Sequence, residues 1–256
     1  MKPIISVVIV TYNREKLLAK AIDSVLCQKF SGFELVIIDD SSTDNTEDLV
    51  KKYLSDERVK YIKIAKSKSI SQVRNSAWPH VSGKYIAVLD SDDIWCDDLK
   101  LNKQFNFLEK NSDFVVVGSA AALINSEDQI IEYVKKPESD NEIRKDFFVK
   151  NPFFHSSVMF RFESVKRIGG YDEKIKFGED LDLWLRLGKE GKFYNFPETM
   201  VKYRIHNDNE IKKHWSGAIL DVLRIIKKNR KTYNAGPLVF LKKIFRKVSE
   251  YFKPKD

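Results

Sequence analysis

The 256-residue sequence predicts an α/β fold, in which a mixed, mostly parallel sheet is flanked by helices and followed by a basic helical C-terminal extension. Three observations support this fold class. Strand-like and helix-like segments alternate through the first half, which is typical of parallel sheets with right-handed crossovers. The strand-like runs are rich in Ile and Val and too short to span a membrane. Polar or acidic residues follow three of the first four strands, at the edge where parallel sheets bind ligands.

Four strands and four helices are expected in the first half. The strands are short apolar runs, namely Ile4–Val10, Phe33–Ile38, Val59–Ile64 and Tyr85–Leu89. The helices are intervening segments with helical apolar spacing, namely Arg14–Gln28, Asp44–Leu54, Ser69–His80 and Asp97–Lys110. Thr43 or Asp44 is the expected cap of the second helix, and Pro79 and Gly83 end the third.

The second half is less regular. Four short strands are expected there, at Phe114–Gly118, Ser157–Phe160, Lys192–Phe196 and Met200–Ile205. The segment Glu179–Glu190 has apolar residues at helical spacing and is closed by Gly191, so we predict a helix. From Asn209 onward the pattern is helical and increasingly basic.

The positive charge is concentrated at the C-terminal end. The formal net charge is +8, but residues 222–256 contain eleven Lys and Arg against two acids, so the rest is close to neutral. A uniformly basic nucleic-acid binder is therefore disfavoured. The segment Leu238–Phe252 has apolar and cationic side chains at helical spacing, which suits an anionic membrane surface. The alternative is an ordinary amphipathic helix packed on the body.

Two features bear on where the protein works. Cys27 and Cys96 make neither a disulfide framework nor a CxxC pair, which favours a reducing cytosol. The N-terminal apolar run leads into Thr11 and Tyr12 without a small-residue cleavage site, so it is a poor signal peptide. We expect a cytoplasmic protein, either free or peripheral on the inner face of the cytoplasmic membrane.

An acidic cluster follows the fourth strand. Asp90 and Asp92 lie two residues apart in Asp-Ser-Asp, a spacing at which both carboxylates can face one small cation. Mg²⁺ and Mn²⁺ prefer such oxygen ligands and leave positions open for substrate phosphates. The alternative is an acidic turn in which Asp93 or Asp97 caps the next helix.

Six segments, in this order and spacing, resemble a family 2 glycosyltransferase with the GT-A fold. They are Ile5–Arg14, Val36–Asp44, Arg74–Asn75, Leu89–Asp93, Gly169–Glu173 and Gly178–Leu187. The resemblance covers about residues 4–206. It implies a GT-A catalytic domain over residues 1–208, with a Rossmann-like nucleotide-binding half at 1–110 and an acceptor half at 111–208. The basic amphipathic tail is then 209–256.

The resemblance implies roles for residues at the strand ends. Nucleotide contacts are implied for Thr11, Tyr12, Arg14, Asp39, Arg74, Asp90 and Ser91. Asp39 suits this role because a carboxylate accepts hydrogen bonds from a ribose hydroxyl and a base N–H. The alternatives are structural: Thr11 or Asn13 caps a helix, Asp40 caps a turn, and Arg74 is a solvated side chain.

The family also implies a metal and a catalytic base. Asp92 is the expected direct ligand of Mn²⁺ or Mg²⁺, Asp90 binds the metal or lies nearer the ribose, and His206 is a further candidate ligand. Asp180 matches the catalytic base, which takes the proton of the acceptor hydroxyl, and Glu179 is the alternate base. Alternatively, these acids have only a structural role in the first turn of a helix, where acidic residues are common.

Two aromatic side chains complete the candidate site. Trp95, three residues after Asp92, is a candidate sugar contact, and His155 fits the acceptor-side loop. For each of them the alternative is a packing residue of the core.

The implied activity is inverting transfer of a sugar from a nucleotide-diphosphate donor, expected to be a UDP-sugar, to a hydroxyl of a glycan or lipid-linked acceptor. A role in bacterial surface polysaccharide synthesis is expected from the family. Three alternatives remain. A nucleotidyltransferase is expected to carry a Gly-rich loop after the first strand, which this chain lacks. A phosphohydrolase is expected to carry a different continuation of Asp-x-Asp. A non-catalytic membrane-associated scaffold would not need the carboxylates that are present.

Overall fold

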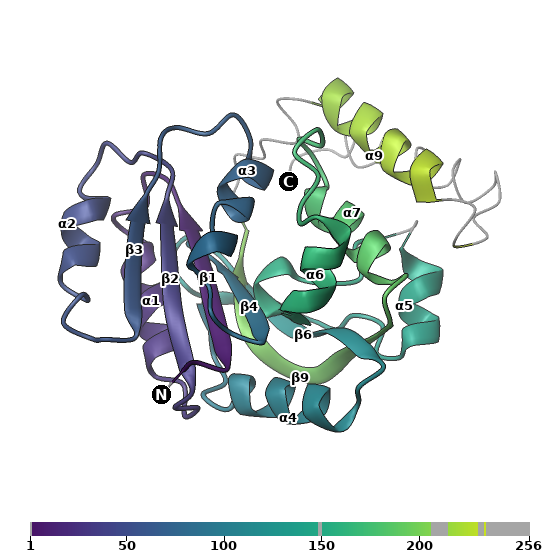
Figure 1. Ribbon diagram of the computed structural model, residues 1–256, viewed down its shortest axis with the longest axis horizontal. Helices are drawn as coiled ribbons and strands as arrows, with labels where there is room; N and C mark the ends of the chain where they lie inside the picture. Colours follow the sequence, from purple (N-terminus) through teal and green to yellow (C-terminus); the bar gives the residue numbers. More distant parts are fainter. Residues whose placement is uncertain (1, 148–149, 206–214, 230–232, 234–256) are drawn as a thin grey trace.

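The computed structural model describes residues 2–147, 150–205, 215–229 and 233, and they form a sheet covered by helices on both faces (Figure 1). The strand order is β3-β2-β1-β4-β8-β6-β9-β5, with β7 paired to β6 at the side. Side chains of β1 alternate between the two layers: Val8 and Val10 join one core cluster, and Val7 and Ile9 join the other. The period of two along a strand thus distributes one apolar run over two cores.

The first half is parallel, as predicted. Strands β1 (Ile5–Thr11), β2 (Phe33–Asp39), β3 (Val59–Lys63) and β4 (Tyr85–Asp90) all run in the same direction. Helices α1 (Leu18–Leu26), α2 (Thr46–Lys51) and α3 (Ile70–Asn75) connect them, and a short 3₁₀ turn, η1 (Trp78–His80), follows α3. Because every residue of β1 and β2 is buried, both faces of these strands are covered, as in other parallel sheets.

The sheet changes direction at β8. Strand β8 (Met159–Arg161) is antiparallel to both β4 and β6 (Phe114–Ile124), while β9 (Lys192–Arg204) runs parallel to β6. The two-residue strand β5 (Ile94–Trp95) pairs with β9 and so joins the loop after β4 to the second half. The sheet is therefore mixed but mostly parallel in its first half, which confirms the predicted fold class.

Four elements of the second half were not predicted. They are β7 (Ile130–Val134), α5 (Asp140–Asp146), η2 (His155–Ser157) and α6 (Phe162–Ile168). The two strands predicted around Pro197 are one strand, β9, because the β6 register shifts between Ser119 and Ala120 and accommodates the proline. Helix α4 (Lys100–Lys110) lies on the α1 side of the sheet.

Two helices cover the other face near the C-terminal end. Helix α7 (Glu179–Leu187) presents the buried Trp184 to the sheet, and α9 (Trp215–Asn229) packs beside α7 (Figure 1). Ile225 and Ile226 of α9 are buried in the same cluster as Trp184. The predicted amphipathic segment Leu238–Phe252 lies outside the described residues. None of the helices described is both long and apolar enough to pass through a bilayer.

Candidate active site

A cavity of about 470 Å³ opens at the carboxyl ends of β1, β2 and β4. The sequence pattern predicted this edge, because parallel strands bring their carboxyl ends together. Six of the residues assigned to nucleotide or metal line the cavity, and they are Thr11, Tyr12, Arg14, Asp90, Ser91 and Asp92.

The end of β1 presents an unsatisfied hydroxyl and an aromatic ring to this cavity. Thr11 is buried, and within the described part of the chain its Oγ1 has no hydrogen-bond partner. Such a buried group is costly unless something bonds to it, which makes Thr11 a candidate ligand contact. Tyr12 is exposed at the rim, and the Lys66 ammonium lies 2.9 Å from the centroid of its ring.

The two carboxylates after β2 differ in position. Asp39 is fully buried and closes the turn, because its Oδ1 accepts hydrogen bonds from the Ser42 backbone N–H (2.8 Å) and hydroxyl (2.6 Å). Its Oδ2 accepts from the Tyr61 hydroxyl. Asp40, assigned by sequence only to a turn, lines the cavity and pairs with Lys66 at 2.8 Å. Asp39 thus supports the turn, and Asp40 presents its carboxylate at the cavity wall. The nucleotide contact of Asp39 stays a prediction.

The acidic loop after β4 is held from both halves of the sheet. The Asp92 carboxylate lies 3.7 Å from the Arg14 guanidinium, at the cavity wall. The buried Asp93 accepts hydrogen bonds from the Ser156 hydroxyl (2.5 Å) and from the Arg204 backbone N–H (2.7 Å). Burial and the charges of the neighbouring carboxylates raise the pKa of Asp93 well above its usual range. Asp93 lines the cavity and also fixes the loop through these two hydrogen bonds.

A buried charge network lies behind this loop. Arg74 donates to Glu179 Oε1 at 2.5 Å and to Asp90 Oδ1 at 3.1 Å, and its guanidinium lies over the Tyr171 ring. His155 bridges the same groups, with Nδ1 3.1 Å from Asp90 Oδ1 and Nε2 3.0 Å from the Tyr171 hydroxyl. Burial alone raises the pKa of Asp90, but His155 and Arg74 outweigh it and hold the pKa well below its usual value.

Glu179 and Asp180, the two candidate bases, have different surroundings. Glu179 faces Arg74, and burial raises its pKa although Arg74 opposes the shift. Asp180 Oδ1 accepts the Leu181 backbone N–H at 2.7 Å, and its Oδ2 accepts the side-chain amide of Asn151. Asn151 was not singled out from the sequence, since an isolated Asn in a loop carries no pattern.

Tyr203 on β9 is a partly buried side chain near several of these acids. It lines the cavity, and burial raises the pKa of its hydroxyl. The negative charges of Asp93, Asp90, Asp180 and Asp92 add to that shift, in decreasing order. The geometric link between the acidic loop and the start of α7 is Arg74, which bonds both Asp90 and Glu179.

Two of the predicted residues lie in the core. Trp95 is buried away from the cavity, where its indole N–H donates to the Ser156 carbonyl at 2.8 Å and Lys100 lies over its ring. His155 is buried in the charge network, behind the cavity wall. His206 lies outside the described residues. Arg204, which sequence reasoning did not select, lines the cavity and donates from Nε to the Asp92 carbonyl at 2.9 Å.

The donor set fits a divalent cation that takes most of its ligands from substrate. Within the described ranges, no three His, Cys, Asp or Glu side chains gather in a metal-binding cluster. Mg²⁺ and Mn²⁺ at phosphate sites need only one or two carboxylates besides phosphate oxygens and water. Asp92, at the cavity wall, supplies such a carboxylate, with Asp90 beside it.

Comparisons with known proteins agree with this geometry. The model of glycosyl transferase family 2 matches residues 6–169. The chain is 34% identical over 218 residues to glycosyltransferase MJ1057 of Methanocaldococcus jannaschii, named as uncharacterized, covering 83% of this chain and 74% of that protein. It is 30% identical over 220 residues to TuaG of Bacillus subtilis, a glycosyltransferase named for teichuronic acid biosynthesis, covering 85% of each.

Solved structures share the fold. S. aureus TarS 1–349 in complex with UDP-GlcNAc matches with a TM-score of 0.69 at 20% identity, covering 88% of this chain and 67% of that one. The mannosyltransferase PcManGT from Pyrobaculum calidifontis, in complex with GDP-Man and Mn²⁺, matches with a TM-score of 0.65 at 14% identity, covering all of this chain and 77% of that one. Since the family model spans more than half of the sequence and the fold agrees, the chain belongs to glycosyl transferase family 2 and has the GT-A fold.

Proposed function

We propose that this glycosyltransferase moves a sugar, with inversion, from a UDP-sugar to a hydroxyl of a glycan or lipid-linked acceptor. The observation that carries the proposal is the Arg74 bridge, which joins Asp90 of the acidic loop to Glu179, the residue before Asp180. A site for this reaction needs one set of groups for the diphosphate and a separate carboxylate for the acceptor. The cavity and the start of α7 supply the two.

The donor occupies the 470 Å³ cavity in this proposal. Thr11 offers a buried hydroxyl without a partner in the described structure, Tyr12 offers a ring at the rim, and Asp40 offers a carboxylate. The diphosphate lies beside Arg14 and Asp92. A divalent cation held by Asp92, with Asp90 and His206 as further candidates, would stabilise the charge that develops on the leaving diphosphate.

Asp180 acts as the base in this proposal. An inverting transfer needs a carboxylate that takes the acceptor's hydroxyl proton as the oxygen attacks the anomeric carbon. Asn151 and the Leu181 backbone N–H fix the Asp180 carboxylate in the first turn of α7. Glu179 is the less suitable base, because its carboxylate already accepts a hydrogen bond from Arg74.

The acceptor and the location are proposed from the family and the charge distribution. The alignment with TuaG covers 85% of this chain, and the name of that protein refers to teichuronic acid biosynthesis. This name supports a polysaccharide acceptor, and we propose surface polysaccharide synthesis at the cytoplasmic membrane face. The catalytic domain is residues 1–208 in this proposal. The basic residues of 209–256 would bring the enzyme to anionic lipid.

Nucleotide-sugar binding with and without Mn²⁺ tests the donor and the metal. Isothermal titration calorimetry with a panel of UDP-sugars and GDP-sugars is expected to show metal-dependent binding of a UDP-sugar. Hydrolysis of the donor is a second measurement, because it needs no acceptor. Nucleotide-sugar binding that does not depend on Mn²⁺ would contradict the proposed metal dependence. A preference for a GDP-sugar would contradict the proposed UDP-sugar donor. Absence of nucleotide binding would reject the proposal as a whole.

Asp180→Asn tests the base. The variant keeps the shape of the side chain but cannot take a proton, so we expect kcat to fall by about 100-fold or more. The affinity for UDP should not change. Glu179→Gln is the matched control and should retain more activity. Full turnover by Asp180→Asn would exclude Asp180 as the base.

A further inference from the structure

Helix α9 is attached to the segment that delivers Glu179 and Asp180 to the site. It lies beside α7 (Figure 1), and its buried side chains Ile225 and Ile226 belong to the cluster that contains Trp184 of α7. The family-model match ends at residue 169, so α9 lies beyond it. Two polar attachments add to this apolar contact, one to the loop before α7 and one to α7 itself.

The first attachment is Asp221. This side chain is only 5% exposed, and its Oδ2 accepts the backbone N–H groups of Lys176 (3.0 Å) and Phe177 (3.3 Å). Its other oxygen accepts from Arg224, whose side chain is largely exposed. A buried carboxylate that bonds two successive backbone N–H groups fixes the path of that backbone.

The held loop leads directly into the candidate base. Gly178 follows in the left-handed region (φ +78°) and begins α7 without a side-chain cap, and Glu179 and Asp180 come next. On the opposite side, the Ser71 hydroxyl donates to the Ile175 carbonyl at 3.2 Å. Asp221 therefore fixes the backbone directly before the first turn of α7 with a contact from a distant helix.

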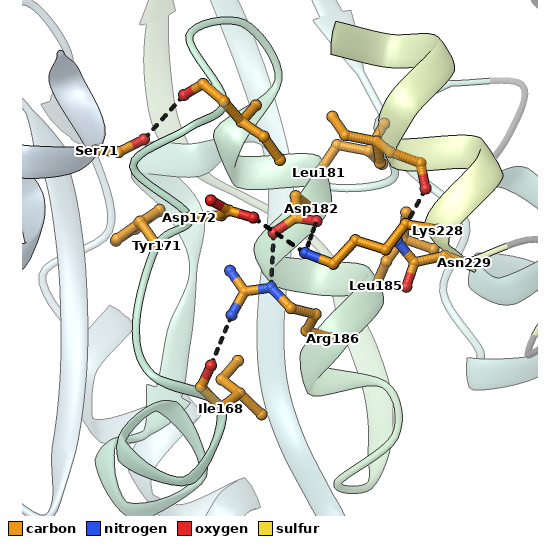
Figure 2. A network of polar contacts seen from close by, with 12 residues as sticks. Ser71, Ile168, Tyr171, Asp172, Leu181, Asp182, Leu185, Arg186, Lys228 and Asn229 are labelled. Carbon is orange, nitrogen blue, oxygen red and sulfur yellow. Dashed lines mark hydrogen bonds and ion pairs between the residues drawn. The ribbon is translucent and has the colours of Figure 1, made fainter.

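The second attachment is Lys228, shown in Figure 2. Its Nζ lies 3.3 Å from Asp182 Oδ1 and 3.1 Å from Asp172 Oδ2. The Asp182 carboxylate is fully buried, and its Oδ2 accepts from Arg186 Nε at 2.6 Å. Asp182 lies two residues after Asp180, on the face of α7 that meets α9. A buried carboxylate needs such compensation, so α9 helps to set the position of α7.

We propose that α9 is a positioning element of the active site, in which Asp221 holds the loop 175–178 and Lys228 holds α7 so that Asp180 faces the reacting hydroxyl. Asp221 and Lys228 are positioning residues and touch no substrate. This inference rests on the proposed function of Asp180. It also moves the proposed end of the catalytic domain from residue 208 to beyond α9.

Kinetics and amide hydrogen exchange of full-length variants test the proposal. For Asp221→Ala we expect a fall in kcat of about 10- to 100-fold from misplacement of the base. The KM for the donor should not change, because α9 does not line the cavity. Exchange should accelerate in residues 175–182 and stay unchanged in β1 and β4. Asp221→Asn retains an acceptor oxygen and should recover part of the kcat.

The controls separate positioning from general stability. Arg224→Ala removes only the exposed partner of Asp221 and should leave kcat unchanged. Lys228→Met should lower kcat, whereas Lys227→Met, an exposed neighbour with the same change of charge, should not. The proposal is overturned if Asp221→Ala keeps wild-type kcat and exchange. It is also overturned if both Asp221 variants lose protection in β1 and β4 together with α7.

The exchange measurement keeps this proposal distinct from the proposed function. If the wild-type protein turns over no nucleotide sugar, the proposed function fails. Exchange in residues 175–182 would still show whether Asp221 and Lys228 hold the segment. If the wild-type protein is active and Asp221→Ala is equally active, only the positioning role fails.

Discussion

Arg74 on α3 pairs with Glu179 at the start of α7, 105 positions further along the sequence, with Nη1 2.5 Å from Oε1. The same guanidinium reaches Asp90, so one side chain links the acidic loop to the helix of the candidate base. Burial opposes the charge on Arg74, but Asp90 and Glu179 outweigh it and raise the pKa of the guanidinium. Arg74 thus remains charged between two carboxylates.

Loss of Arg74 should destabilise the fold. Arg74→Met leaves Glu179 and Asp90 without their shared counter-charge, and we expect the free energy of unfolding to fall by about 3 kcal/mol, measured by urea denaturation. Arg58→Met is the control, because the Arg58–Asp56 pair is about one-third exposed and should contribute at most about 1 kcal/mol. Equal losses in the two variants would contradict a structural role for the Arg74 network.

Asn151 should matter for turnover and not for donor binding. Asn151→Ala removes the amide that donates to Asp180 Oδ2, and a hydrogen bond to a charged group is worth about 1.5–3 kcal/mol. We expect kcat to fall by about 10-fold or more. Steady-state kinetics at saturating donor check this, and Asn141→Ala, exposed on α5, is the control. A higher donor KM with unchanged kcat would place Asn151 at the donor instead.

Glu34 should give the stability an acid-sensitive component. Burial alone raises the pKa of this carboxyl, but Lys60, the Ser6 hydroxyl and the Ser82 backbone N–H outweigh it and lower the pKa below 4.5. The contribution is therefore present above the unfolded-state pKa and is lost as pH falls through the folded-state pKa. Urea unfolding should show Glu34→Gln less stable by about 1–3 kcal/mol at pH 7.

That difference between Glu34→Gln and the wild-type protein should shrink as the pH falls below about 4.5. Glu57→Gln is the control, because Glu57 is exposed, and it should not change the pH dependence. A gap between Glu34→Gln and wild type that stays constant down to pH 3 would contradict the lowered pKa.

Removal of residues 234–256 should separate membrane binding from catalysis. The shortened chain keeps α9, so we expect unchanged donor hydrolysis. It loses six Lys and Arg, each worth about 1 kcal/mol near an anionic surface, so vesicle affinity should fall by at least about 10-fold. Sedimentation with anionic and neutral vesicles checks this. Unchanged binding to the anionic vesicles would assign the tail to packing.

The parallel half of the fold could be predicted because its signals are local. Apolar strands alternate with helices, and the acids at the strand ends meet at one edge. The turn contacts of Asp39 and the position of Asp40 at the cavity wall could not be predicted from the sequence. Strand β2 ends between these two residues, and the alternation of faces stops there. Ser42 and Tyr61 bond Asp39 into the turn, and both contacts depend on tertiary structure.

The second half carries weaker signals. Helix α5 buries Ile143 among mostly polar residues, so no apolar stripe marks it, although its capping box, Ser139 with Glu142, was readable. Strand β9 continues past Pro197 because β6 shifts its register, which is a property of the partner strand. Asn151 and Arg204 act through contacts made by the fold, and their positions in the sequence carry no motif.

The pairing of β5 with β9 has a consequence for how the enzyme moves. Ile94 is in register with Lys202, and Trp95 with Val201, so the acidic loop is joined by backbone hydrogen bonds to the far half of the sheet. A rotation of one half against the other would break this ladder and the β4–β8 ladder as well. We therefore expect substrate entry and product release to proceed by rearrangement of loops around a rigid frame, and solution scattering should show the same radius of gyration with and without bound nucleotide.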